Sequence, residues 1–146
     1  MHGISLKEIM TKSVVTVNVA DRFSIVEKRL RENKIRHLPV VDNKNHVVGL
    51  VSQRDLYRIS PPRKTSEGDV YDTEYLDGFI LSSVMTPIVQ TLSDQTAFKE
   101  AVYLMVEKKL GCIPVIDKDE HLCGILTKTD VLKFLSRSFR NAEGLK

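Results

Sequence analysis

The chain has 146 residues, of which 42% are hydrophobic and 28% are charged. This length suits one ordinary domain or two very small ones and excludes a large multidomain enzyme. The composition supports a core that buries roughly 70% of the unfolded surface, which excludes a disordered chain. The sequence contains no run of about 18 apolar residues that could span a bilayer, and its first residues lack the apolar core of a signal peptide. We therefore expect a cytoplasmic protein without a membrane partner.

The net charge of +3 is unevenly distributed along the chain. Residues 1–60 carry 11 basic and 6 acidic groups, residues 61–80 carry 2 and 5, and residues 81–146 carry 9 and 8. The first part is therefore the basic one. Its basic residues are scattered, without a stripe of arginines or interleaved aromatic side chains, so a nucleic-acid partner is the least favoured interpretation.

The sequence of the first part of the chain predicts secondary-structure elements in the order β-α-β-β-α. A short turn at residues 6–10 leads to an extended run at 14–17, and a helix follows whose apolar positions 23, 26 and 30 fall on one face. Two strands at 37–41 and 47–51 flank a polar turn, and a last helix begins near Ser52. A unit of this size cannot bury its helices and sheet well alone, so a second unit is expected beside it.

The second part predicts the same order after a linker at residues 60–80. Two prolines end the preceding helix, and the acidic stretch that follows lacks periodicity, except for a short turn of helix expected near residues 72–76. The counterparts of the first part are a turn at 81–85, a run at 88–92, an amphipathic helix from Phe98, strands at 112–116 and 122–126, and a helix from Thr127. The tail at 135–146 is expected to fray.

The two parts are copies of one another at an offset of 75 residues. Residues 6–59 align without a gap on residues 81–134, with 14 identities in 54 positions, where composition alone would give about 3. The predicted fold class is therefore α/β (α+β), with one domain at 6–59, a second at 81–134, the linker between them and the tail.

The sequence offers no catalytic or metal-binding signature. It lacks a phosphate-binding Gly-rich loop, a dinucleotide fingerprint, a zinc-protease helix and a nucleophile elbow, so we expect no enzyme. His46 and His121 follow polar turns and lack ligand partners at metal spacing, which favours exposed positions at strand edges and no metal. Cys112 and Cys123 are too few for a disulfide framework and match no zinc spacing, so we expect reduced, buried thiols.

The junction between the third strand and the last helix carries the most chemistry. Both copies read Gly, two apolar residues, Ser or Thr, two further residues and Asp, ending at Asp55 and Asp130. Such a pattern resembles a capping box, in which Ser52 or Thr127 caps the helix. The same geometry offers helix-terminal amides to a phosphate and a carboxylate to the two hydroxyls of a ribose. Both roles can coexist.

The order of these motifs, repeated twice, resembles the CBS domain, and the tandem pair resembles the Bateman module. The resemblance rests on Met-Thr, a strand ending in Thr, an amphipathic helix, apolar-Pro-Val-apolar-Asp and the Ser/Thr-x-x-Asp junction, and it covers roughly residues 5–135. It implies two units joined through their sheets with pseudo-twofold symmetry. It also implies clefts that bind adenosyl ligands such as AMP, ADP, ATP, S-adenosylmethionine or NAD, with no required cofactor.

The resemblance assigns residues to two clefts, each drawing on both copies. The Asp130 cleft would use Thr11, Val15, Ile35, Arg36, His37, Pro39, Thr127, Lys128 and Asp130. The Asp55 cleft would use Ser52, Arg54, Asp55, Thr86, Gln90, Leu110, Gly111, Cys112 and Pro114. The two Asp residues would hold the ribose, and Thr127 and Ser52 would hold the phosphate. The apolar residues would contact the base. Arg36, His37, Arg54 and Lys128 are the groups expected to neutralise phosphate.

The two copies differ at one wall of the clefts. Arg36-His37 in the first copy stands where the second has Gly111-Cys112, so the Asp130 cleft is expected to be more positive and better suited to phosphates. The simpler interpretation of Arg36 and His37 is a solvated turn, and that of Pro39 and Pro114 is a strand-edge proline.

The sequence thus favours a regulatory, energy-sensing module that binds an adenine nucleotide and signals to an effector protein. The family resemblance implies homodimerisation through the helices. The alternative is an interaction or dimerisation scaffold with empty clefts, whose Ser/Thr-x-x-Asp motifs only cap helices. A nucleic-acid binder is the third and weakest interpretation.

Overall fold

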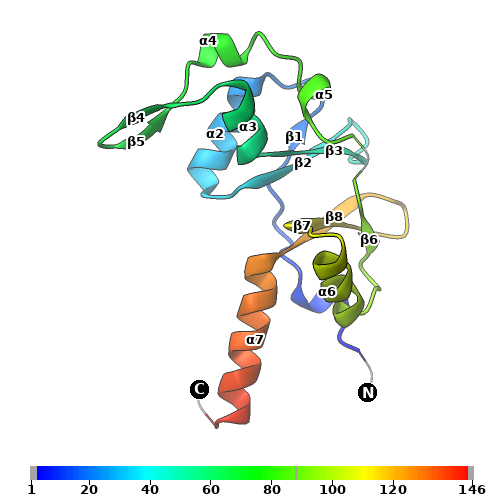
Figure 1. Ribbon diagram of the computed structural model, residues 1–146. Coiled ribbons are helices and arrows are strands. Elements are labelled where there is room, and N and C mark those ends of the chain that lie inside the picture. The colour runs from blue at the N-terminus through cyan, green and yellow to red at the C-terminus, as the bar shows by residue number, and fades with distance from the viewer. Residues whose placement is uncertain (1–2, 88, 145–146) are drawn as a thin grey trace. The chain divides into compact units, whose positions relative to one another are not determined.

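The computed structural model describes residues 3–87 and 89–144, which divide into two compact units (Figure 1). One unit is residues 15–89, and the other combines residues 1–14 with residues 90–146. We call residues 15–89 the middle unit and residues 1–14 with 90–146 the terminal unit. Each unit contains a three-stranded sheet and the helices that cover it.

The middle unit follows the predicted β-α-β-β-α order and then adds a linker. Its sheet has the order β1-β2-β3, with β1 parallel to β2 and β3 antiparallel to it. The linker folds into a two-stranded hairpin of β4 and β5 and then the short helix α4, and α5, the opening turn of the second repeat, follows it. The elements are β1 (Val17–Asn18), α2 (Phe23–Asn33), β2 (His37–Val41), β3 (Val47–Ser52), α3 (Gln53–Ile59), β4 (Arg63–Thr65), β5 (Gly68–Val70), α4 (Thr73–Leu76) and α5 (Leu81–Val84).

The terminal unit repeats this plan. Its sheet has the order β6-β7-β8 with the same parallel and antiparallel pairings. Its elements are α1 (Leu6–Ile9), β6 (Leu92–Ser93), α6 (Phe98–Glu107), β7 (Cys112–Ile116), β8 (Leu122–Thr127) and α7 (Lys128–Ala142). The repeat extends to backbone detail, since Lys34 and Lys109 both end a helix in the left-handed conformation, and Asn45 and Glu120 both adopt it in the hairpin turns.

Each unit has its own hydrophobic core beneath the helix faces that the sequence predicts. Phe23, Val26 and Leu30 of α2 are buried against the sheet of the middle unit. In the terminal unit, α6 buries Phe98, Ala101 and Met105 in the same way, and Val102 is partly buried. The predicted amphipathic helices and the α/β fold class are confirmed.

The opening segment of each repeat packs in the unit formed by the other repeat. Residues of the first opening segment pair with the second repeat through Leu6 N–H to Thr96 O (2.9 Å) and through Thr11, which exchanges two backbone hydrogen bonds with Ile125 (2.9 Å each). Correspondingly, Thr86 exchanges backbone bonds of 2.8 and 3.0 Å with Leu50. The compact units therefore do not follow the boundaries of the sequence repeats.

A methionine lies over a glycine at each of these crossings. A Cβ built on Gly124 would lie 2.3 Å from Met10 Sδ, and one built on Gly49 would lie 2.3 Å from Met85 Sδ. The glycines are therefore needed for close approach of a side chain, not for a turn. This explains why the Met before each Thr and the Gly in each third strand recur together in the two copies.

Several expectations from the sequence were wrong in detail. The extended runs at 14–17 and 88–92 form strands of two residues each, Val17–Asn18 and Leu92–Ser93, and Ile88 lies outside the described residues. The tail does not fray from residue 135, because α7 continues to Ala142. The linker contains the expected helical turn, α4. It also contains a hairpin that was not predicted, because its sequence lacks the alternating apolar residues typical of strands.

We predict that Gly124→Ala destabilises the protein by about 1–3 kcal/mol, because the new methyl group overpacks the space filled by Met10. The measurement is the free energy of unfolding in urea for Gly124→Ala, Met10→Ala and the double variant. The double variant is expected to lose less than the sum of the singles, since Met10→Ala removes the clash. Strictly additive losses would contradict the contact, and the Gly49 and Met85 pair provides an internal replicate.

Candidate functional site

In the terminal unit, Thr127 and Asp130 hydrogen-bond to each other where β8 meets α7, and this hydrogen-bonded group is called a corner. Asp130 Oδ2 accepts hydrogen bonds from Thr127 N–H (2.8 Å) and Thr127 Oγ1 (3.0 Å), and Thr127 Oγ1 accepts one from Asp130 N–H (3.3 Å). This is a capping box that satisfies amides at the start of α7, and the negative charge is favourable at that end of the helix. The capping role predicted for the junction is confirmed.

A third residue, Thr11, completes the corner from the opening segment. Its Oγ1 donates to Asp130 Oδ1 at 2.8 Å, across 119 positions of sequence. The backbone bonds between Thr11 and Ile125 hold the hydroxyl there. Both oxygens of the nearly buried Asp130 are thus engaged, one by the cap and one by Thr11. Three residues assigned to the Asp130 cleft are therefore brought together within one unit.

In the middle unit, Ser52 and Asp55 form the equivalent corner at the start of α3. Asp55 Oδ2 accepts from Ser52 N–H (2.9 Å) and Ser52 Oγ (3.0 Å), so the capping prediction is confirmed here as well. The other oxygen has a different partner, because Arg58 Nη2 lies 3.0 Å from Asp55 Oδ1. Thr86, the counterpart of Thr11, is held by its backbone bonds to Leu50.

The role of Arg58 was missed at the sequence level, although a signal was present. Asp55 and Arg58 are three positions apart on a predicted helix, which is a spacing at which opposite charges meet. The second copy has Lys133 at the equivalent position, and among residues 3–87 and 89–144 no ion pair joins Lys133 to Asp130. The two corners therefore differ in charge around the second carboxylate oxygen.

Several of the other predicted residues lie beside these corners within each unit. In the middle unit, His37 is the strand partner of Ser52, and Gln53 N–H donates to Arg36 O at 2.9 Å. In the terminal unit, Cys112 is the strand partner of Thr127, and Lys128 N–H donates to Gly111 O at 3.4 Å. Of the other predicted residues, the terminal unit holds Gln90, Leu110 and Pro114, and the middle unit holds Val15, Ile35, Pro39 and Arg54.

Pro39 and Pro114 occupy the middle strands β2 and β7, so the interpretation of a strand at the sheet edge was wrong. Each proline pairs with a third-strand residue, Leu50 or Ile125, on its antiparallel side. On the other side, β1 and β6 begin pairing only at the following residues, Val40 and Val115. A proline is tolerated there because no parallel neighbour requires its missing amide.

The two cysteines are free thiols in different environments. Cys112 is buried, and desolvation raises the pKa of its thiol to about 12. Cys123 is only partly buried, against the expectation, and desolvation raises the pKa of its thiol in the same direction. Because the thiolate is the reactive form, both cysteines are poor nucleophiles at neutral pH.

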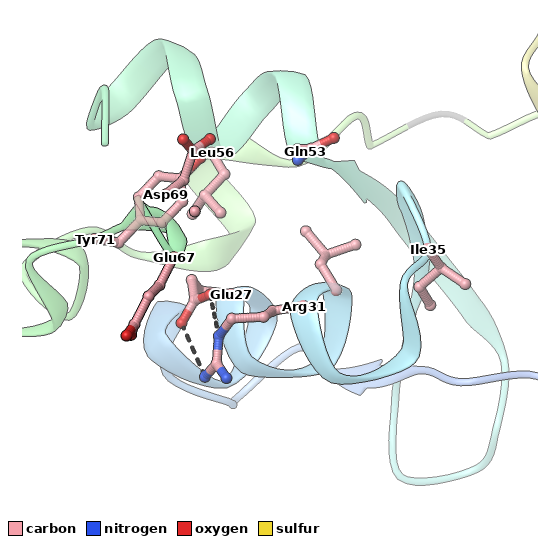
Figure 2. A pocket seen from close by; sticks show the side chains of 10 residues that line it. Glu27, Arg31, Ile35, Gln53, Leu56, Glu67, Asp69 and Tyr71 are labelled. Carbon is pink, nitrogen blue, oxygen red and sulfur yellow. Dashed lines mark hydrogen bonds and ion pairs between the residues drawn. The ribbon is translucent and has the colours of Figure 1, made fainter. Parts of the chain in front are cut away.

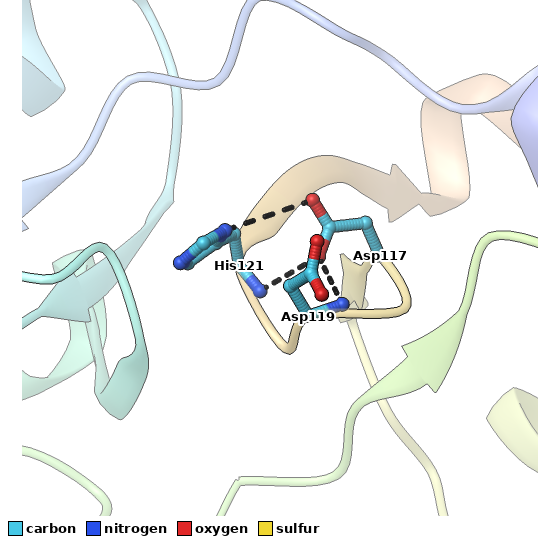
Figure 3. Close-up of side chains that lie close together, drawn as sticks. All are labelled: Asp117, Asp119 and His121. Carbon is cyan, nitrogen blue, oxygen red and sulfur yellow. Dashed lines mark hydrogen bonds and ion pairs between the residues drawn. The ribbon is translucent and has the colours of Figure 1, made fainter.

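Asp117, Asp119 and His121 gather at the turn between β7 and β8 (Figure 3), where one potential ligand atom from each lies within 4.8 Å of the others. The expectation that His121 lacks a carboxylate neighbour was therefore wrong. Backbone geometry explains the gathering, since Asp117 Oδ1 accepts from the N–H groups of Asp119 (2.9 Å) and His121 (3.0 Å). These bonds, that from His121 foremost, lower the pKa of Asp117. The other repeat builds the same turn around Asp42 without a second carboxylate.

Among the described residues, no helix is both long enough and apolar enough to cross a membrane.

Comparison with known proteins settles the family. The family model for the CBS domain matches residues 6–61 and 81–137, which is more than half of the chain. The chain belongs to the CBS domain family. The two matched stretches correspond to the two sequence copies, so the protein is a CBS pair.

Relatives of similar length are themselves CBS proteins. A CBS domain-containing protein of Dictyostelium discoideum is 33% identical over 132 residues, which cover 90% of this chain and 91% of the relative. The structure of CBSX2 in complex with AMP, a CBS-pair protein of Arabidopsis thaliana, has a TM-score of 0.78 and 27% identity and covers 94% of this chain and 100% of that one.

Other relatives show the fold or contain the pair as a part. The CBS domain pair of the protein MJ0100, in complex with 5′-methylthioadenosine and S-adenosyl-L-methionine, matches with a TM-score of 0.72 and 20% identity over 90% of this chain and 99% of that one, which shows a shared fold. Several curated relatives are longer, and this chain spans 63%, 36% and 33% of three of them.

Proposed function

We propose that the protein is a regulatory module that binds an adenosyl ligand and catalyses no reaction. The observation that carries the proposal is the corner of Thr11, Thr127 and Asp130, which presents a nearly buried carboxylate beside the amides of a 15-residue helix. The AMP complex of CBSX2 supports the ligand class, because that protein is 27% identical to this chain. AMP, ADP and ATP are the first ligands to test, followed by S-adenosylmethionine and NAD.

The ribose is assigned to the second oxygen of Asp130. The cap uses Oδ2, whereas Oδ1 accepts only one hydrogen bond from the neutral hydroxyl of Thr11. A carboxylate oxygen has room for a further donor, and Thr11 Oγ1 can itself rotate to another acceptor. The ribose hydroxyls therefore add to this corner without breaking the helix cap, and the Thr127 hydroxyl and helix amides face the phosphate.

The phosphate is assigned to exposed cations of the Asp130 cleft. Arg36 and Lys128 are exposed, and His37 lies beside Arg36 in the first strand residue of β2. The solvated Arg36 and Lys128 can turn toward a phosphate at little cost in desolvation. Arg54, two residues after Ser52 at the start of α3, is the exposed cation proposed for the Asp55 cleft. The surplus of positive charge in the first repeat has an intramolecular use in this proposal.

The Asp130 corner is proposed to bind first. At Asp55 the second oxygen is already paired with a cation, Arg58, so ribose hydroxyls compete with an ion pair there. At Asp130 they meet a neutral hydroxyl. Exposed ion pairs contribute under about 1 kcal/mol, so the difference in affinity is about fivefold or less.

The protein is proposed to act as a homodimer that signals to an effector protein. On α7, Leu132, Leu135 and Phe139 form an exposed apolar stripe, with Leu132 65% and Phe139 62% exposed. Tyr103 and Val106 of α6 are exposed as well, and a ring contact between Phe98 and Phe134 joins α6 to α7. Large exposed apolar surface of this kind is typical of an interface. The cytoplasmic location stays a prediction, as does the alternative of a scaffold with empty clefts.

Asp130→Asn is expected to weaken AMP binding at least tenfold, because the amide has lost the charge that attracts two ribose hydroxyls. Isothermal titration of the wild type, Asp130→Asn and Asp55→Asn measures the affinity and stoichiometry, with circular dichroism to confirm folding. Asp55→Asn is expected to affect only the weaker site. Unchanged affinity in Asp130→Asn would overturn the ribose assignment. A wild type that binds none of the five adenosyl ligands at millimolar concentration would favour the scaffold.

Arg58→Gln is expected to strengthen AMP binding at the weaker site by up to about fivefold, because it frees the second oxygen of Asp55. Lys133→Gln is the matched control at the equivalent position and is expected to leave both affinities unchanged. A weaker second site in Arg58→Gln would show instead that Arg58 contacts the phosphate.

Phe139→Lys is expected to convert a dimer of the 16.6 kDa chain into a monomer, because it places a charge in the apolar stripe of α7. Light scattering after gel filtration measures the mass. Ile80→Lys, at an exposed apolar residue of the middle unit, is the control and should remain dimeric. A wild type that elutes with the mass of one chain at about 100 μM would refute the homodimer.

A further inference from the structure

A pocket of about 410 Å³ lies in the middle unit, where the linker hairpin faces α2 and α3 (Figure 2). Its volume is within the range of small-molecule sites, about 300–1,000 Å³. The lining residues come from α2 and the turn after it, from α3, and from the hairpin and the residue that follows it: Glu27, Leu30, Arg31, Ile35, Gln53, Leu56, Glu67, Gly68, Asp69 and Tyr71. It does not contain Ser52 or Asp55, and it shares only Ile35 with the residues assigned to the nucleotide clefts.

The two ends of the pocket differ in chemistry. Figure 2 shows Glu67, Asp69 and Tyr71 at one end and Ile35 and Gln53 at the other. Leu30 and Leu56 contribute apolar surface from the core of the unit. A molecule that fills the pocket therefore needs an elongated apolar body and one polar end.

Tyr71 provides an unused hydrogen-bonding group at the polar end. Its hydroxyl oxygen is buried and is, among the described residues, the one buried side-chain oxygen or nitrogen without a hydrogen-bond partner. Desolvation, followed by the charge of Asp69, raises the pKa of Tyr71, so the hydroxyl is neutral at physiological pH. A buried hydroxyl without a partner is energetically unfavourable, and a ligand that bonds to it recovers this loss.

The charges around the polar end do not cancel. Glu27 is paired with Arg31 Nε at 2.9 Å, and Asp69 is paired with Lys64 Nζ at 3.0 Å. Glu67 remains, since no ion pair within residues 3–87 and 89–144 engages its carboxylate, and its backbone N–H is bonded to Thr65 Oγ1. The polar end thus carries one negative charge without an ion-pair partner and one hydroxyl that can accept a hydrogen bond.

We propose that this pocket binds a small organic cation, a protonated primary amine on an apolar body. The ammonium group lies between Glu67 and Tyr71 and donates hydrogen bonds to both, and the apolar body lies along Leu30 and Leu56 toward Ile35. An ammonium group supplies three donors and one positive charge, which complement the hydroxyl of Tyr71 and the carboxylate of Glu67. An anion is excluded by Glu67 and Asp69, and a neutral molecule leaves Glu67 uncompensated.

The test compares three probes of one shape and different charge: 2-phenylethylamine, 2-phenylethanol and 3-phenylpropionate. Each is titrated into the ¹⁵N-labelled protein while amide chemical shifts are recorded. The amine is expected to shift the amides of residues 27–35 and 67–71, with an affinity at least tenfold above those of the alcohol and the acid. Equal binding of the three probes, or no binding of the amine at 10 mM, would overturn the proposal.

Two variants and one control test the assigned contacts. Glu67→Gln and Tyr71→Phe are each expected to weaken binding of the amine about five- to tenfold. Glu67 is exposed, and Tyr71→Phe removes only the unpartnered hydroxyl, so neither is expected to lower the melting temperature. Glu74→Gln changes an exposed carboxylate outside the pocket and should leave amine binding unchanged. Amine binding unaffected by Glu67→Gln would reject the assignment. A parallel titration of the same variant with AMP distinguishes an effect on this pocket from an effect on the adenosyl site.

Discussion

Each half of this protein is completed by a short segment that the sequence assigns to the other half. Thr11 joins β8 through two backbone hydrogen bonds to Ile125, and Thr86 joins β3 through two to Leu50. Met10 and Met85, the residues before them, occupy the space above Gly124 and Gly49. A single β-α-β-β-α copy has too small a sheet to bury its helices well. The exchanged segments add buried surface to both units and make neither repeat structurally independent of the other.

This exchange also positions the chemistry of the terminal unit. Asp130 would cap α7 with or without the opening segment, because Thr127 and Asp130 are neighbours on the chain. Thr11, by contrast, reaches Asp130 only because the backbone bonds to Ile125 place it there. The same two bonds that complete the sheet therefore set the environment of the second carboxylate oxygen. Fold and candidate site depend on one contact, and the Met-Thr pair at the start of each repeat has a structural reason to recur.

Local and periodic features were predictable from the sequence, and contacts between distant residues were not. The faces of α2 and α6 followed from apolar spacing, and the helix starts at Ser52 and Thr127 from the capping pattern. The length of β1 was not predictable, because Val14 to Val17 all favour a strand and only the partner strand decides where pairing begins. The β4–β5 hairpin was missed because its exposed residues carry no buried face. The family resemblance placed Thr11 and Asp130 in one cleft, but nothing in the sequence predicted the hydrogen bond between them.

The two interpretations of the Ser/Thr-x-x-Asp junction concern different oxygens of the same carboxylate. In both copies the cap uses Oδ2, which accepts from the backbone and hydroxyl of Ser52 or Thr127. Capping is therefore satisfied before any ligand is considered, and it leaves Oδ1 to distinguish the copies. At Asp55 that oxygen is paired with Arg58, and at Asp130 it accepts from Thr11. A motif that looks equivalent in the sequence thus becomes two sites of unequal charge. The deciding residue is Arg58, three positions after Asp55, in one copy and Thr11, 119 positions before Asp130, in the other.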